Sequence, residues 1–147
     1  MRALVFLIGG GRYALALSAL RRVLPVMALQ PLPAAPEGVA GLMNLHGAVV
    51  PVLDLERMAG LPPAAPCFDT RILLVDYPGA DGRLHLLGLR AAHVLGIEEV
   101  DGSAPAGVQA AAFLGPVTHD DSGLIHWIAL PQLISPQVQA ALFAEAA

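Results

Sequence analysis

The sequence predicts an all-β fold made of two small β-barrels packed against each other. Two observations carry this prediction: the apolar runs are short and end at turn residues, and the order of segments repeats once along the 147 residues. Many short strands joined by Gly- and Pro-containing turns are typical of sandwiches and barrels. Because the order repeats, the chain is expected to build the same unit twice.

The strands are predicted from apolar runs that are bounded by turn-forming residues. Gly9–Gly11 and Pro78–Gly82 each follow such a run and supply the positive-φ positions of hairpin turns. Pro51 indicates an edge position or a bulge, because proline cannot donate a backbone hydrogen bond to a neighbouring strand. The predicted strands are Leu4–Ile8, Val49–Leu53, Ile72–Asp76 and Leu124–Ile128.

The repeat is visible when the two halves of the chain are aligned. Arg12–Val26 can be laid without gaps on Arg83–Ile97, and Ala48–Met58 resembles Gly123–Leu133. Both halves then have the same order: hairpin, connecting strand, long loop, strand and short helical turn. Few residues are identical, so the duplication is a hypothesis about architecture.

Two short helices are predicted from their caps. Asp54 is expected to cap a helical turn that runs through Met58 and ends near Gly60. Near the end of the chain, Ser135 fits the N-cap position and Pro136 the first helical position.

The composition excludes several classes of function. Hydrophobic residues make up 56% of the chain, whereas about 45–50% is usual in soluble proteins. The apolar runs are nevertheless shorter than the roughly 20 residues of a spanning helix, so direct membrane insertion is not expected. Residues 1–20 resemble a signal peptide, but Gly9–Gly11 and Arg12 favour a folded strand pair. With a net charge of −4 and no basic stripe, nucleic acid is an unsuitable partner. The single Cys67 excludes an internal disulfide, so the cytoplasm is the default location.

No motif for catalysis, metal binding or cofactor binding is present. The five histidines include no HxxxH or HExxH pair, no GxSxG motif occurs, and Gly9–Gly11 lies between two strands rather than before a helix. Cys67, the single cysteine, is interpreted as a small apolar residue. The sequence therefore predicts no catalytic residue, no cofactor and no metal. A small β-barrel enzyme or ligand-binding module stays open as an alternative.

One segment resembles the signature of the CheW family. Pro31–Leu55 reads PLPAAPEGVAGLMNLHGAVVPVLDL, which is similar to the family's PLP loop, NLRG segment and P-hydrophobic-x-D-L strand. LVFLIGGGRYALAL resembles the family's opening hairpin, and LLGLRAAHVLGI resembles its central element. The resemblance extends from Leu4 to Ile134.

This resemblance implies a single CheW-like domain over residues 1–147 with two intertwined five-stranded β-barrels, a hydrophobic inter-barrel groove and a short C-terminal α-helix. We expect one subdomain at about residues 10–70 and the other at about 71–135, closed by the N-terminal strand and the C-terminal helix. The implied function is a non-catalytic adaptor. Its implied partners are the regulatory domain of a CheA-type histidine kinase, the cytoplasmic tip of chemoreceptors and other CheW-like modules.

The residues expected to contact these partners lie in the groove and on its flanks. They are Leu20, Arg22, Val23, Asn44, His46, Leu89, Arg90 and Val94. The chain departs from the family pattern where charges are expected: acids fall on Arg22, Arg90 and Ala129, and an arginine falls on His46. Because charge pattern governs partner choice, we expect a divergent adaptor with non-standard partners, in a system that controls surface motility or biofilm rather than swimming. A ring spacer that has lost kinase binding is the alternative.

Overall fold

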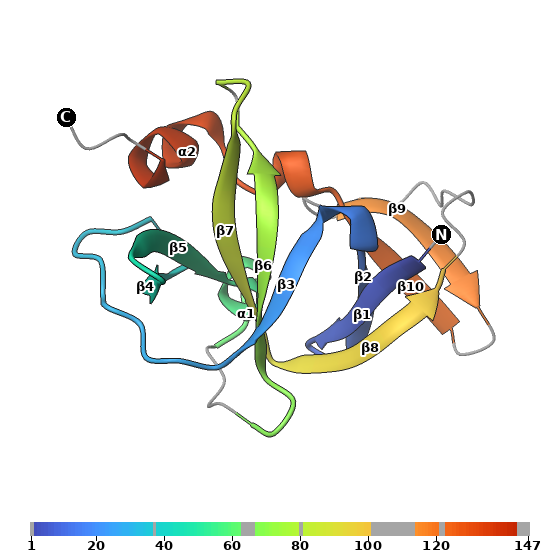
Figure 1. Ribbon diagram of the computed structural model, residues 1–147. Helices are drawn as coiled ribbons and strands as arrows, with labels where there is room; N and C mark the ends of the chain where they lie inside the picture. Colours follow the sequence, from blue (N-terminus) through green and yellow to red (C-terminus); the bar gives the residue numbers. More distant parts are fainter. Residues whose placement is uncertain are drawn as a thin grey trace.

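The computed structural model describes residues 2–36, 38–62, 67–79, 81–100, 114–120 and 123–143, with the side chains of 114–116, 119 and 120 excepted. Ten strands form two five-stranded sheets in this part of the chain (Figure 1). Sheet A has the order β8-β1-β2-β10-β9 and sheet B the order β3-β6-β7-β5-β4. Sheet A contains β1 (Arg2–Ile8), β2 (Gly11–Ala16), β8 (His93–Glu99), β9 (Leu114–Asp120) and β10 (Gly123–Ile128). Sheet B contains β3 (Leu20–Pro25), β4 (Val39–Leu45), β5 (Ala48–Asp54), β6 (Arg71–Pro78) and β7 (Leu84–Ala91).

The two sheets have the same pairing scheme, and this confirms the predicted two-part, intertwined architecture. The first five strands can be matched in order with the last five, so that β1 corresponds to β6, β2 to β7 and β3 to β8. When each strand of sheet A is replaced by its match, the strand order of sheet B results. Each half of the chain therefore supplies its first hairpin to one sheet and its remaining three strands to the other. The expected split into residues 10–70 and 71–135 does not describe the sheets, because the chain crosses between them after β2 and again after β7.

The alignment of the two halves needs a shift of three residues. Ala14 lies beside Trp127 in the parallel pair of β2 and β10, and Gly88 lies beside Val52 in the parallel pair of β7 and β5. Since Val52 corresponds to Trp127 in the second repeated segment, Ala14 corresponds to Gly88, whereas the gapless alignment matched it to His85. Few identities mark the register here, so the sequence alone misplaced it.

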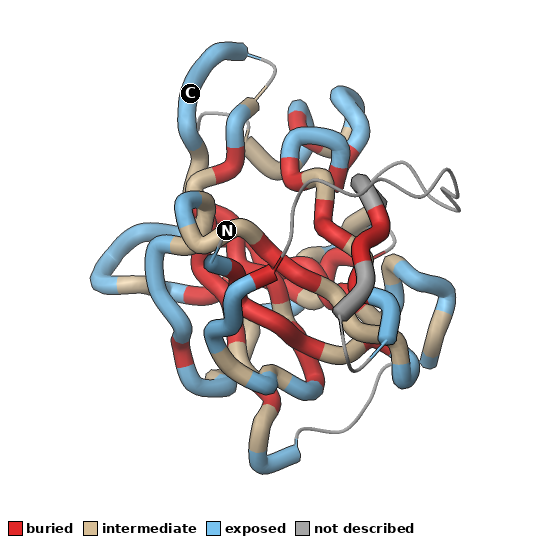
Figure 2. The backbone as a smooth tube through the Cα atoms, turned by 90° about the vertical axis from the view of Figure 1, so that its right-hand side faces the viewer, coloured by how far each residue is buried: buried red, intermediate tan, exposed pale blue. Residues whose placement is uncertain are grey.

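Three hydrophobic clusters stabilise this arrangement. One cluster lies within each sheet, and the largest lies between the sheets, where apolar residues of β1 and β2 meet those of β6 and β7. Figure 2 shows the buried segments gathered in the centre of the molecule and the exposed segments at its periphery. The central cluster includes Phe6, Leu15, Leu73, Leu89 and Tyr77.

Each sheet curls, but its first and last strands are not paired with each other in the described residues. The outermost strands of sheet B are β3 and β4, and the chain that follows β3 closes part of the gap by pairing Gln30 with Leu42 of β4. Both backbone hydrogen bonds of that pair measure 2.8 Å. The predicted barrels are thus two curled sheets in the described residues.

The predicted helix caps are confirmed. Asp54 accepts hydrogen bonds from the backbone N–H groups of Glu56 and Arg57 and begins α1 (Leu55–Met58). Ser135 accepts one from Val138 and begins α2 (Pro136–Leu142). Two 3-10 turns complete the described structure, η1 (Leu17–Ala19) and η2 (Leu130–Gln132). None of these described helices is long and apolar enough to cross a membrane.

Pro51 does not lie on an edge strand. Its strand β5 lies between β4 and β7, so the predicted edge position is wrong for the strand as a whole. The ladder to β7 begins only at Val52, however, and Pro51 lies in the part of β5 that pairs with β4 alone. The missing N–H of proline therefore costs no hydrogen bond on the β7 side.

Candidate partner-binding surface

An apolar groove lies between the two sheets. Its volume is about 390 Å³, and it forms where η1 and the chain leaving β10 meet the hairpin of β6 and β7. Sheet A and its connections contribute Ala16, Ala19, Ile128 and Pro131, and sheet B contributes Pro78 and Leu84. Leu84 stands at this groove with 69% of its surface exposed. The groove thus offers aliphatic and small side chains to an apolar ligand or helix face.

Asp76 is the one charged side chain in the groove lining. Its carboxylate accepts a hydrogen bond from the Arg21 guanidinium at 3.0 Å, and the Arg21 side chain is 59% exposed. An ion pair this exposed contributes little to stability. It leaves a charged rim beside the groove, which suits control of partner choice more than affinity.

Three of the predicted contact residues lie on β3, the edge strand of sheet B. Arg22 and Val23 are exposed, Val23 by 41%, while Leu20 is partly buried against the central cluster. Sheet B continues past β3 on one side only, through β6. The opposite side of β3 has no strand neighbour in the described residues, so Arg22 and Val23 flank an open strand edge.

Val94 lies on β8, which occupies the matching edge of sheet A. Its side chain is partly buried against the central cluster. Leu95 and Ile97 on the same strand are 51% and 50% exposed, and sequence reasoning missed them. Their spacing of two residues was the available signal, because alternate side chains of a strand share one face.

Asn44 and His46 lie at the hairpin of β4 and β5. Leu45 pairs with Ala48, so His46 and Gly47 form a two-residue turn, with φ angles of 52° and 89°. The Asn44 carboxamide accepts the Gly47 N–H at 2.9 Å. Both residues are exposed; Asn44 lies on β4, the edge strand opposite β3, and His46 lies in the turn that follows it. The positive φ angles of His46 and Gly47 are those of a type I′ turn.

Leu89 is buried and Arg90 is partly buried, so neither offers the open contact surface that was expected of it. Leu89 is 1% exposed within the central cluster. Arg90 pairs with Asp54 at 3.5 Å, and their side chains are 11% and 4% exposed. Asp54 and Arg90 are neighbours across the parallel pair of β5 and β7. The groove lining includes none of the eight predicted contact residues.

Cys67 is exposed and lies in a polar setting, so its interpretation as a small apolar residue is wrong. Its sulfur lies 3.1 Å from a carboxylate oxygen of Asp69, and His93 Nδ1 lies 3.1 Å from the same oxygen. The hydrogen bond from the Cys67 thiol is the largest cause that lowers the pKa of Asp69. These three residues are the group in the described chain with the geometry to hold a metal ion.

Comparison with known proteins identifies the family. A family model described as CheW-like domain matches residues 2–137. The chain belongs to the CheW-like domain family. It is 28% identical over 109 residues to the chemotaxis protein CheW of Bacillus subtilis strain 168, covering 74% of this chain and 69% of that protein. Its structure is similar to the crystal structure of the scaffolding protein TtCheW from Thermoanaerobacter tengcongensis, with a TM-score of 0.79, 25% identity and coverage of 92% of this chain and 94% of that chain.

Proposed function

We propose that this CheW-like protein is a non-catalytic, cytoplasmic adaptor that couples chemoreceptors to a CheA-type histidine kinase in a bacterial chemosensory array. The observation that carries the proposal is the groove, whose lining is aliphatic apart from Ser18 and the rim carboxylate of Asp76. An active site would need several convergent polar groups. Family membership and the scaffold similarity support the same function.

The groove is the proposed seat of the receptor. In this proposal the receptor tip presents an amphipathic helix, which binds by laying its apolar face in the groove. Leu84 and Pro131 offer aliphatic contact from the two sides. The charged pair of Arg21 and Asp76 then lies beside the seated helix and selects among receptors by charge.

The open edges are the proposed seats of the kinase regulatory domain and of other CheW-like modules. Val23 on β3, and Leu95 and Ile97 on β8, expose apolar side chains on strands that have one strand neighbour each within the described part of the chain. Such edges are prone to pair with another chain. Arg22 adds a positive charge to the β3 edge, where the family pattern has an acid, so the proposed kinase partner carries a complementary acid.

Titration calorimetry tests the proposal with the regulatory domain of the CheA-type kinase encoded nearest to this protein and with a peptide of the receptor tip. We expect micromolar binding of the kinase domain, near −8 kcal/mol. Val23→Asp should reduce that binding at least tenfold and leave receptor binding unchanged. Leu84→Asp should do the reverse, because Leu84 lines the groove.

Val49→Asp is the matched control for both variants. Val49 is 70% exposed, like Leu84, but lies on β5 outside the groove. Equal losses in all three variants would contradict the assignment of the two surfaces. A protein that is folded, binds its own copies and ignores the kinase would instead be a ring spacer.

A further inference from the structure

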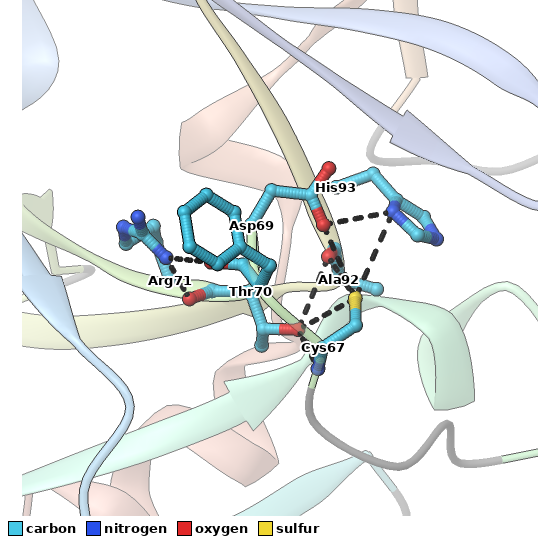
Figure 3. A network of polar contacts seen from close by, with 7 residues as sticks. Cys67, Asp69, Thr70, Arg71, Ala92 and His93 are labelled. Carbon is cyan, nitrogen blue, oxygen red and sulfur yellow. Dashed lines mark hydrogen bonds and ion pairs between the residues drawn. The ribbon is translucent and has the colours of Figure 1, made fainter.

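Cys67, Asp69 and His93 form a compact group at the crossover between the sheets. One ligand atom from each lies within 4.8 Å of the others. The Cys67 sulfur is 3.1 Å from Asp69 Oδ1 and 3.8 Å from His93 Nδ1, and the latter two atoms are 3.1 Å apart. Figure 3 shows the three side chains converging, with dashed lines that also join the sulfur to Thr70 and Ala92.

These distances are close to those of a tetrahedral zinc site. Zinc binds thiolate at about 2.3 Å and imidazole or carboxylate at about 2.0–2.2 Å, which separates neighbouring ligand atoms by roughly 3.3–3.6 Å. The observed separations of 3.1, 3.1 and 3.8 Å bracket that range. Shifts of a few tenths of an ångström would complete the geometry, and the His93 and Asp69 side chains, 49% and 41% exposed, have room to make them.

The backbone holds the three residues in place. Thr70 is 1% exposed, and its hydroxyl accepts the Cys67 N–H at 2.9 Å and donates to the Ala92 carbonyl at 3.1 Å. The Val94 N–H donates to the Asp69 carbonyl at 3.1 Å. These bonds fix the turn before β6 against the first residues of β8. A ligand set held in this way loses little freedom when it binds an ion.

The surroundings of the sulfur contain more acceptors than donors. The Cys67 sulfur lies 3.1–3.2 Å from Asp69 Oδ1, Thr70 Oγ1 and the Ala92 carbonyl, and a thiol carries one hydrogen. Asp69 Oδ1 also faces His93 Nδ1. A cation placed among these atoms would be in reach of the sulfur, the Asp69 carboxylate oxygen and the His93 ring nitrogen at once.

We propose that Cys67, Asp69 and His93 bind a zinc ion. The Cys67 thiol releases its proton to solvent, the sulfur forms a bond to zinc, and His93 Nδ1 and one Asp69 oxygen supply the second and third ligands. Because the group is at the surface, water takes the fourth position. A thiolate and an imidazole select zinc over magnesium or calcium, which prefer oxygen ligands.

The ion would join the two sheets. Cys67 and Asp69 lead into β6 of sheet B, and His93 begins β8 of sheet A. Zinc would therefore fix the angle between sheets whose groove is the proposed receptor seat, although the group itself lies outside the groove lining. The inference stands whether or not the adaptor function is correct.

Cobalt titration of the full-length protein, prepared without a polyhistidine tag, tests the site. We expect one equivalent of Co²⁺ to produce thiolate-to-cobalt charge-transfer absorption in the near ultraviolet, and one equivalent of Zn²⁺ to abolish it. Cys67→Ser should remove the absorption, and His93→Gln should weaken binding at least tenfold. Absence of the charge-transfer band in the folded protein would overturn the proposal.

His85 and Asp81 provide the matched control. They form the other close His–Asp pair of the described chain, at 2.9 Å, with no cysteine beside them. His85→Gln should leave cobalt binding unchanged, and an equal loss in His85→Gln and His93→Gln would contradict the assignment. As a second readout, zinc should slow alkylation of Cys67 and raise the melting temperature of the parent protein but not of Cys67→Ser. Unchanged alkylation with bound zinc would place the ion elsewhere.

Discussion

The two sheets share one pairing scheme but fill their interiors differently. At three matching positions, sheet A has Ala3, Ala14 and Trp127, whereas sheet B has Ile72, Gly88 and Val52. Sheet A thus packs one large indole ring against two alanines, whereas sheet B packs two medium-sized aliphatic side chains around a glycine. Because close packing constrains total volume more than the identity of each residue, a duplicated fold can lose nearly all identities and keep its topology.

The ends of the matching strands β5 and β10 also differ, because one carries a charged residue and the other an alanine. Asp54 is the last residue of β5, caps an α-helix and pairs with Arg90. The matching Ala129 directly follows β10 and begins a 3-10 turn without a side-chain cap. At this place sheet B therefore has a side-chain cap and a nearly buried ion pair, and the alanine at the matching position of sheet A can supply neither. Substitutions at these matching positions can test how much each solution contributes.

Asp54→Ala should have the largest effect on stability. It removes the cap of α1 and one ion-pair partner of the nearly buried Arg90. Breaking a buried ion pair from one side costs about 3–5 kcal/mol. Urea unfolding followed by circular dichroism should show this loss. Asp54→Asn keeps a capping oxygen and loses the charge, so it should cost less; equal costs would assign the effect to something other than the cap.

Gly88→Ala should cost about 1–3 kcal/mol by overpacking the interior of sheet B. A Cβ at this position would lie 3.0 Å from methyl groups of both Ile72 and Val52. The cost should shrink in a Val52→Ala background, which a double-mutant cycle in urea measures. Ala14→Gly, at the matching position of sheet A, opens space instead. If both single variants were neutral, the two interiors would not be packed as described.

Tyr77→Phe should cost about 1 kcal/mol, the usual contribution of one hydrogen bond. Tyr77 is buried and its hydroxyl donates to the Pro131 carbonyl at 2.9 Å, whereas the matching residue of sheet A is Ile8. Burial raises the pKa of Tyr77. The folded form therefore keeps its proton above pH 10, where an unfolded tyrosine ionises, and stability falls as the pH rises through that region.

The Tyr77→Phe variant should lose that part of the alkaline slope. Urea unfolding of the parent and the variant at pH 7 and pH 10.5 measures the difference between their slopes. An identical slope in the parent and the variant would show that the ionisation of Tyr77 does not contribute to the loss of stability at alkaline pH.

The contrast between the sheets also shows what the sequence reveals and what it hides. Strands, hairpin turns and the caps at Asp54 and Ser135 depend on neighbouring residues, so they were predicted from local patterns. The crossing of each half between the sheets is set by pairing over long distances. For the same reason Leu89 was misassigned to the surface, and Cys67 and His93, 26 residues apart, were not expected to meet.

Ala129→Asp should have the smallest effect, and it asks why the two strand ends differ. An aspartate at the N-cap normally bonds backbone N–H groups of the first turn. Here Pro131 has no N–H, and the Gln132 N–H already donates to the Ala129 carbonyl at 3.0 Å. The change in unfolding free energy should therefore stay below about 0.5 kcal/mol, less than a typical cap contributes.

Adding Pro131→Ala to Ala129→Asp restores a donor at the second position of the turn. The aspartate should then act as a cap and stabilise the double variant by about 1 kcal/mol relative to Pro131→Ala alone. A gain of this size in unfolding free energy would show that Pro131, rather than the missing acid, is the reason why the turn after β10 has no side-chain cap like that after β5. No gain would mean that the surrounding groove residues, Ile128 among them, hold the 3-10 turn regardless of its cap.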